Sequence, residues 1–214
     1  MALPKLQIAL DNNTLSDAIK SISQVGAEVD IVEVGTILCL TEGMEAVRCM
    51  RALYPDKIVL ADTKCADAGT TVARNCAEAG ADWMTVICCA EIPTMTSALK
   101  ELKDVQIELY GDWTFDQAKD WKEAGLSQVV YHQSRDALLA GKTWGDEDLA
   151  KIRKLVDMGF KVSVTGGLEV DTVKLFEGIA VEAFIAGRGI RDAEDPAQAA
   201  REFKAEIKRY WGNE

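Results

Sequence analysis

The feature that most constrains the fold of this chain is a regular alternation of short apolar segments with longer amphipathic segments. Each apolar segment has the length and composition of a buried strand, and each is followed by a segment with helical spacing. The predicted strands are residues 6–10, 29–35, 58–61 continuing into 62–64, 83–88, 105–109, 128–132, 161–167 and 183–188. The predicted helices are residues 15–22, 43–53, 70–79, 94–103, 114–123 and 146–158, a short helix from 170, and 196–210.

This order predicts one parallel sheet, because a parallel connection needs a crossover and a helix usually provides it. Eight strand–helix units favour an α/β fold of the closed (β/α)8 type, a TIM barrel, over an open sheet. The open sheet is also disfavoured because no G-x-G-x-x-G motif follows the first strand. No Ser/Pro-rich linker divides the 214 residues. We therefore expect a single compact barrel domain over residues 1–214, with short loops.

Charge and composition exclude several classes of partner. The net charge of −11 argues against binding to nucleic acid, and no apolar run approaches the ~20 residues that cross a membrane. Residues 1–4 do not have the pattern of a signal peptide. The six cysteines lie mostly among apolar neighbours and form no C-x-x-C pair, so we expect buried free thiols and no structural zinc. A cytoplasmic location follows from this cysteine usage.

A D-x-K-x-x-D motif lies where the third predicted strand leaves the core. Asp62 and Lys64 have the spacing of two that places side chains on one side of a strand, and Asp67 follows in the loop. Neighbouring carboxylates would keep the lysine cationic, which suits the stabilisation of an oxyanion. The motif alone is equally compatible with an exposed cluster of ion pairs.

Polar or glycine-rich features recur at the carboxyl ends of most predicted strands, where a barrel carries its active site. They are Asp11, Glu33, Asp62 with Lys64 and Asp67, Glu108, His132 with Arg135, Thr165-Gly166-Gly167, and Gly187-Arg188. Such residues are common wherever strands turn into loops, but their coincidence on one face favours a functional site. Each group then has its own predicted chemistry.

Glu33 and Asp62 supply hard oxygen ligands from adjacent strands, which suits Mg²⁺. The glycines after strands seven and eight, with Arg188, occupy the usual phosphate-binding corner of a barrel. His132 and Arg135 can deliver or steer a proton near neutral pH. Lys64 beside a bound Mg²⁺ can stabilise an enolate-like oxyanion.

These residues together resemble the orotidine 5′-monophosphate decarboxylase superfamily, and within it the family of 3-keto-L-gulonate 6-phosphate decarboxylases. The D-x-K-x-x-D motif with Asp11 marks the superfamily, and the resemblance extends over essentially the full length. Its segments are residues 7–11, 32–36, 62–67, 106–109, 131–136, 165–167 and 186–188. Glu33 stands where the metal-independent orotidine enzymes carry a lysine, which argues for the metal-dependent branch.

The alternative within that branch is D-arabino-hex-3-ulose 6-phosphate synthase, an aldolase that joins formaldehyde to ribulose 5-phosphate. The synthase pattern has aspartate at the position of Glu108 and lacks an arginine at the position of Arg135. Both positions here follow the decarboxylase. Because the two activities share their chemistry, we expect synthase activity at most as a weak side reaction.

The resemblance implies a carboxy-lyase that converts a phosphorylated keto sugar acid, 3-keto-L-gulonate 6-phosphate, into L-xylulose 5-phosphate and CO2 through an enediolate, in L-ascorbate or related sugar-acid catabolism. It implies Mg²⁺ on Glu33 and Asp62, stabilisation of the enediolate by Lys64, and protonation by His132 and Arg135. Asp11 and Glu108 would position substrate hydroxyls and neighbouring side chains. The phosphate would be held by Thr165, Gly166, Gly167, Gly187 and Arg188. It also implies a homodimer with sites at the interface, where Asp67 reaches the partner's site.

Overall fold

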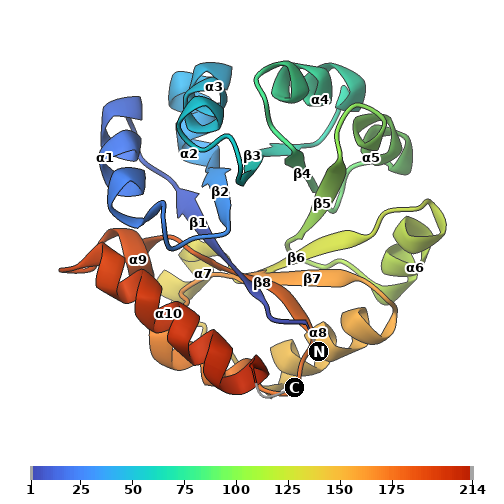
Figure 1. The fold of residues 1–214 in the computed structure, drawn as a ribbon. Coiled ribbons are helices and arrows are strands. Elements are labelled where there is room, and N and C mark those ends of the chain that lie inside the picture. Colours follow the sequence, from blue (N-terminus) through green and yellow to red (C-terminus); the bar gives the residue numbers. More distant parts are fainter. Residues whose placement is uncertain (1, 213–214) are drawn as a thin grey trace.

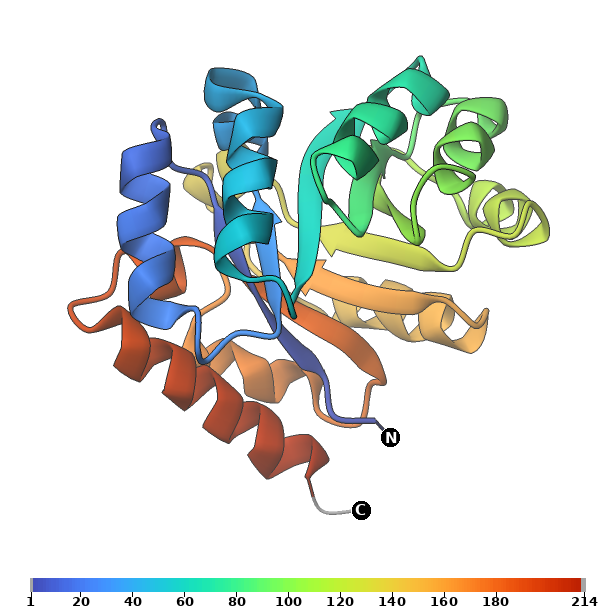
Figure 2. The same ribbon diagram turned by 45° about the horizontal axis from the view of Figure 1, so that its top comes forward.

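The computed structural model describes residues 2–212, which form a closed barrel of eight parallel strands surrounded by helices (Figures 1 and 2). The predicted (β/α)8 fold is confirmed, and each strand pairs with its neighbours in sequence order until β8 closes on β1. The strands are β1 Lys5–Leu10, β2 Ile31–Val34, β3 Ile58–Cys65, β4 Trp83–Ile87, β5 Asp104–Leu109, β6 Gln128–His132, β7 Lys161–Thr165 and β8 Val181–Ala186.

Helices separate the strands along the chain and lie outside the barrel (Figure 1). They are α1 Leu15–Val25, α2 Thr36–Glu42, α3 Met44–Leu53, α4 Gly69–Glu78, α5 Ile92–Leu99, α6 Phe115–Glu123, α7 Arg135–Leu139, α8 Asp146–Asp157, the 3₁₀ helix η1 Val170–Phe176, α9 Arg188–Arg191 and α10 Pro196–Trp211. β1 begins and α10 ends at the same end of the barrel (Figures 1 and 2).

Two hydrophobic layers hold the barrel together. The larger layer lies between strands and helices, where side chains such as Ile8, Val32 and Phe184 are fully buried. The alternate residues of each strand face the barrel interior, because strand side chains alternate between the two faces. Among them Ala9, Val130 and Ile185 form one small apolar cluster, and Ile31, Leu60 and Ala183 form another. These side chains fill the part of the interior that lies between the ends of the barrel.

Several boundaries differ from the sequence prediction. α2, α7 and α9 were not predicted, because each is short; α7 begins after Ser134, whose hydroxyl accepts a hydrogen bond from the Ala137 amide at 3.1 Å. The eighth strand ends at Ala186 instead of residue 188, so Arg188 is the first residue of the short helix α9. All three unpredicted helices closely follow strand ends and contribute residues to the site.

The end of β3 departs from regular strand geometry. Its register against β4 shifts between Ala61 and Cys65, and Lys64 has a φ of 45°. A lysine in this left-handed region is uncommon and costs roughly 1–2 kcal/mol. The backbone amide of Lys64 donates to the Thr85 hydroxyl at 2.8 Å, which holds the irregular conformation. This bulge determines where the lysine side chain points.

Two further predictions concern the burial of the cysteines and the lack of a membrane-spanning segment. All six cysteines are free thiols, but the prediction that they are buried is wrong for Cys89, which lies exposed in the turn after β4, and Cys39 and Cys49 are only half-buried. No helix in the described part of the chain combines the length and the apolar composition needed to cross a membrane.

Candidate active site

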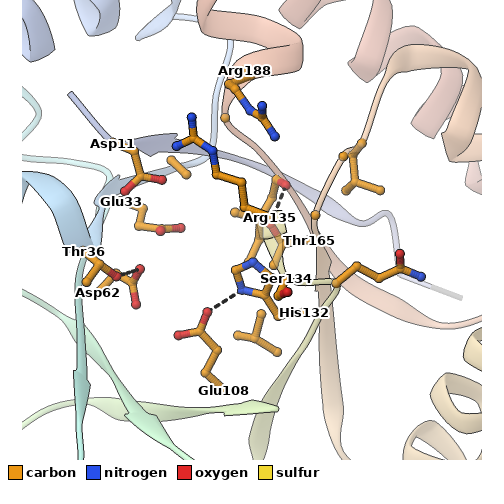
Figure 3. A pocket seen from close by; sticks show the side chains of 18 of the residues that line it. Asp11, Glu33, Thr36, Asp62, Glu108, His132, Ser134, Arg135, Thr165 and Arg188 are labelled. Atoms are coloured by element: carbon orange, nitrogen blue, oxygen red, sulfur yellow. Dashed lines mark hydrogen bonds and ion pairs between the residues drawn. The ribbon is translucent and has the colours of Figure 1, made fainter. Parts of the chain in front are cut away.

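A cavity of about 520 Å³ opens at the carboxyl ends of the strands. Figure 3 shows side chains from strands on opposite sides of the barrel converging on it. The apolar cluster of Ala9, Val130 and Ile185 lies at its base. Of the residues singled out from the sequence, the cavity is lined by Asp11, Glu33, Asp62, Lys64, Glu108, His132, Arg135, Thr165, Gly166, Gly167, Gly187 and Arg188.

Asp67 is the one member of that set that does not line the cavity. It lies exposed in the loop between β3 and α4, and its carboxylate accepts a hydrogen bond from the Ala68 amide at 2.7 Å. Ala68 itself has a φ of 55°. The loop therefore presents Asp67 away from the site of its own chain.

Asp62 is the centre of a buried hydrogen-bond network. One carboxylate oxygen accepts from Thr85 Oγ1 at 2.7 Å, and the other accepts from Thr36 Oγ1 and Lys64 Nζ, each at 2.6 Å. Burial alone would raise the pKa of Asp62, but the charge of Lys64 and these three donors hold the pKa below its ordinary value. Asp62 is therefore an anion with a fixed orientation.

Lys64 lies between two buried carboxylates. Its Nζ is 2.6 Å from Asp62 and 3.0 Å from Glu108 Oε2, and it donates to Thr36 Oγ1 at 2.7 Å. Burial would lower the pKa of Lys64, but the charges of Asp62 and Glu108 outweigh it and raise the pKa above its ordinary value. The lysine is a permanent cation at the wall of the cavity, suited to an oxyanion and unsuited to act as a nucleophile.

Glu33 has no cation bonded to it in the described part of the chain. It is 7% exposed, and its one hydrogen-bond donor there is Gln7, from β1. Burial, with the neighbouring charges of Asp62 and Asp11, raises the pKa of Glu33 well above its ordinary value. Three carboxylates thus converge on one side of the cavity (Figure 3), and a bound cation would relieve their repulsion.

The donor set fits Mg²⁺ in the form predicted from the sequence. Residues 2–212 contain no cluster of three or more His, Cys, Asp or Glu side chains arranged to hold a metal ion. Mg²⁺ does not require one, because it commonly takes one or two carboxylates and completes its shell with water and substrate oxygens. Glu33 and Asp62 are hard oxygen donors of this kind, with a charge excess that a divalent cation would balance.

On the opposite side, Glu108 joins the lysine to the only histidine of the chain. Glu108 is 3% exposed, and its Oε1 lies 2.5 Å from His132 Nδ1 (Figure 3). A carboxylate can only accept, so Nδ1 carries the proton in this contact. Nε2 is then the ring nitrogen that can exchange a proton with a ligand.

The phosphate corner is built from backbone turns and arginines. Gly166 and Gly167 have φ values of 105° and 61°, and they follow Thr165, whose hydroxyl donates to the Ile185 carbonyl at 3.1 Å. Among residues 2–212, neither Arg135 nor Arg188 forms an ion pair. Both guanidinium groups reach into this part of the cavity (Figure 3), where an anion would neutralise them.

We expect Gly166→Ala to weaken phosphate binding. A Cβ at residue 166 would lie 2.1 Å from the Gln133 carbonyl oxygen, so the turn would have to move. Calorimetric titration with inorganic phosphate is expected to show at least a tenfold loss of affinity. Gly125→Ala is the control, because Gly125 also has a positive φ, of 88°, but open space around it. That variant is expected to lower Tm and to leave phosphate binding unchanged; equal losses in both variants would contradict the role of the turn.

Four contributors to the site were not singled out from the sequence: Thr36, Thr85, Gln7 and Tyr110. Their side chains donate to Asp62, Glu33 and Glu108. Tyr110 could have been identified from the sequence, because it lies two residues after Glu108, the same spacing that grouped Lys64 with Asp62. Thr36 was not, since it begins a helix that has no distinctive sequence pattern.

Comparison with known proteins was made by sequence and by structure. Residues 4–203 match the model of the orotidine 5′-phosphate decarboxylase / HUMPS family. The 3-keto-L-gulonate-6-phosphate decarboxylase UlaD of Salmonella paratyphi B is 57% identical over 99% of this chain and 100% of its own length.

Solved structures are also similar to this chain over nearly its full length. The KGPDC of Streptococcus mutans, in the crystal structure of its ligand complex, superposes with a TM-score of 0.97 at 60% identity, over 99% of this chain and all of that one. A 3-hexulose-6-phosphate synthase from Salmonella typhimurium gives a TM-score of 0.90 at 31% identity, over 96% of this chain and 99% of that one.

Proposed function

The chain belongs to the orotidine 5′-phosphate decarboxylase / HUMPS family, and we propose that it is a Mg²⁺-dependent 3-keto-L-gulonate 6-phosphate decarboxylase. The observation that carries this proposal is the cation of Lys64, held between Asp62 and Glu108 at the wall of a cavity whose other side is a phosphate corner. The full-length similarity to proteins of that name supports the choice of substrate.

The two ends of the cavity orient the substrate. The 6-phosphate binds at Gly166, Gly167, Gly187 and Arg188, with Thr165 beside them. The keto-acid end then lies toward Lys64 and the carboxylates of Asp11, Glu33 and Asp62, which line the same cavity. Mg²⁺, held by Glu33 and Asp62, would supply a Lewis acid for the oxygens at this end.

Decarboxylation breaks the bond between C1 and C2, and its electron pair passes to the C3 carbonyl. CO2 leaves, and the rest of the substrate becomes an enediolate, with a double bond between C2 and C3 and a negative charge on the C3 oxygen. The Lys64 ammonium lies ready to stabilise that oxyanion, because Asp62, Glu108 and Thr36 fix it in place before the reaction. Preorganised charge of this kind accounts for roughly 10²–10³ in rate per donor.

Protonation at C2 completes the reaction and gives L-xylulose 5-phosphate. We assign this step to His132 and Arg135, directly or through water. Glu108 holds the imidazole by Nδ1 and leaves Nε2 for the exchanging proton. A reaction run in D2O tests the assignment: NMR is expected to show L-xylulose 5-phosphate with one deuterium at C1, and a product that lacks it would contradict protonation from a solvent-exchangeable acid.

The phosphate contact gives a further prediction. Arg188→Ala is expected to raise KM for the phosphorylated substrate by about 10²-fold with a smaller change in kcat, because it removes a charge-assisted contact distant from the reacting carbons. Steady-state kinetics measure both parameters, and inorganic phosphate should inhibit the wild type more strongly than the variant. Arg153→Ala, which removes contacts to the Gly178 and Glu177 carbonyls outside the site, is the control. An unchanged KM in Arg188→Ala would place the phosphate elsewhere.

We also propose that the active form is a homodimer in which Asp67 acts in the partner's site. Asp67 is exposed and does not line the cavity of its own chain, so a catalytic role requires a second copy. Mixing and refolding two inactive variants, Asp67→Asn and Lys64→Ala, is expected to restore up to a quarter of wild-type activity, since half of the mixed dimers' sites are intact. No restoration would contradict a shared site.

The 3-hexulose-6-phosphate synthase reaction is the second candidate, favoured by the structural similarity to a protein of that name. Glu108 and Arg135 follow the decarboxylase pattern, so we assign the synthase reaction to a weak side activity. The proposal places the enzyme in the cytoplasm, in L-ascorbate or related sugar-acid catabolism, without nucleic-acid or membrane partners.

A further inference from the structure

Tyr110 lies directly after β5 and contacts both His132 and Glu108, the carboxylate that holds the imidazole. Its hydroxyl is 2.8 Å from His132 Nδ1, 3.3 Å from His132 Nε2 and 3.3 Å from Glu108 Oε1. The Tyr110 and His132 rings are 4.6 Å apart with an interplanar angle of 35°. From this geometry we propose that Tyr110 is a positioning residue, which keeps His132 oriented for proton transfer in the reaction proposed above.

The backbone of Tyr110 is held in place by Cys88, the first residue after β4. The Tyr110 amide donates to Cys88 Sγ at 3.4 Å, and the Cys88 thiol donates to the Tyr110 carbonyl at 3.3 Å. Cys88 is buried. Lys64 Nζ lies 6.0 Å from the centroid of the Tyr110 ring. Contacts within the protein therefore hold the phenol beside the imidazole, and its position does not depend on a ligand.

The hydroxyl can partner His132 in both of its protonation states. The phenol proton goes to Glu108 Oε1, and the phenol oxygen can accept from the Nδ1–H whether or not Nε2 carries a proton. Burial raises the pKa of Tyr110, and the charges of Glu108 and Asp62 raise it further, so the phenol keeps its proton throughout. A proton can then enter and leave the imidazole without the ring losing its contacts.

The chain contains a single histidine, so a nitrogen-15 spectrum of the ring reports on His132 alone. In the ligand-free wild type at one fixed pH, we expect the Nδ1–H tautomer and an Overhauser contact between the His132 and Tyr110 rings. In Tyr110→Phe, which keeps the ring but loses the contact to Nδ1, the Nδ1 signal should shift and broaden. Tyr54→Phe is the matched control, because it removes a hydroxyl bonded to the Ile22 carbonyl, outside the cavity, and should leave the imidazole signals unchanged.

Kinetics then test whether the contact matters for turnover. Tyr110→Phe is expected to lower kcat about tenfold and to change KM less than twofold, the loss of one hydrogen bond at the acting acid. In a His132→Gln background the same substitution should have no further effect, since Tyr110 acts through His132. A merely structural role would lower activity by the same factor in both backgrounds.

The outcomes separate this inference from the proposed function. Imidazole signals that are the same in wild type and Tyr110→Phe, absence of the ring–ring contact in the wild type, or additive effects in the double variant would each overturn the role of Tyr110. Altered imidazole signals together with a wild type that releases no CO2 would instead overturn the proposed substrate. That result would leave the positioning of His132 by Tyr110 supported.

Discussion

Replacing Lys64 with alanine is expected to lower kcat for CO2 release by about a thousandfold or more while the barrel stays folded. The ammonium is the one cation that Asp62 and Glu108 hold together at the reacting end of the cavity. Without the ammonium, the negative charge that develops on the enediolate would face those two carboxylates with no cation between them. Steady-state assay of CO2 release measures the effect, and circular dichroism with a thermal melt checks the fold.

The same substitution also separates catalysis from stability. Tm should fall, because Asp62 and Glu108 lose a charged partner inside the protein. Lys103→Ala is the control: Lys103 pairs with Asp82 at 2.5 Å, contacts no part of the cavity and is largely exposed. Its kcat should equal that of wild type. Turnover retained by a folded Lys64→Ala protein would remove the lysine from the mechanism.

Replacing Glu33 with glutamine is expected to have opposite effects on activity and stability. The substitution removes a metal ligand, so CO2 release at saturating Mg²⁺ should fall by at least a hundredfold. It also removes a buried charge that Asp62 and Asp11 repel. The metal-free variant should therefore melt above the metal-free wild type, by about 2–4 °C for each kcal/mol of relieved repulsion.

Thermal melts with and without Mg²⁺ give a readout that does not depend on turnover. Wild-type Tm should rise on addition of Mg²⁺, since a ligand that binds only the folded state stabilises it, and the rise should disappear in Glu33→Gln. Glu182→Gln is the matched control, because Glu182 pairs with Lys5 outside the cavity. It should keep the full Mg²⁺-dependent rise. A Glu33→Gln protein that still responds to Mg²⁺ would move the metal site elsewhere.

The barrel was predictable because hydrophobic periodicity and strand–helix alternation are local signals, and eight units favour a closed barrel over an open sheet. The same reasoning placed Glu33, Asp62, Glu108 and His132 on one face, since all four stand at or near strand ends. These signals do not depend on how side chains pair across the cavity.

What the sequence did not predict was set by such pairing or by irregular backbone. Thr36 and Thr85 become donors to Asp62 only because β2 and β4 flank β3 in the closed barrel. The direction of Lys64 depends on a positive φ that a lysine rarely adopts. The position of Asp67 outside its own cavity agrees with what the family resemblance implied, but the spacing of the motif alone does not encode the path of the loop after that bulge.

The most direct test of the central claim is a paired assay on metal-stripped protein, with and without Mg²⁺. One arm follows CO2 release from 3-keto-L-gulonate 6-phosphate, and the other follows condensation of ribulose 5-phosphate with formaldehyde. We predict fast, Mg²⁺-dependent CO2 release and a much slower second arm. A dominant condensation reaction, or CO2 release that is the same with and without Mg²⁺, would contradict the proposed function.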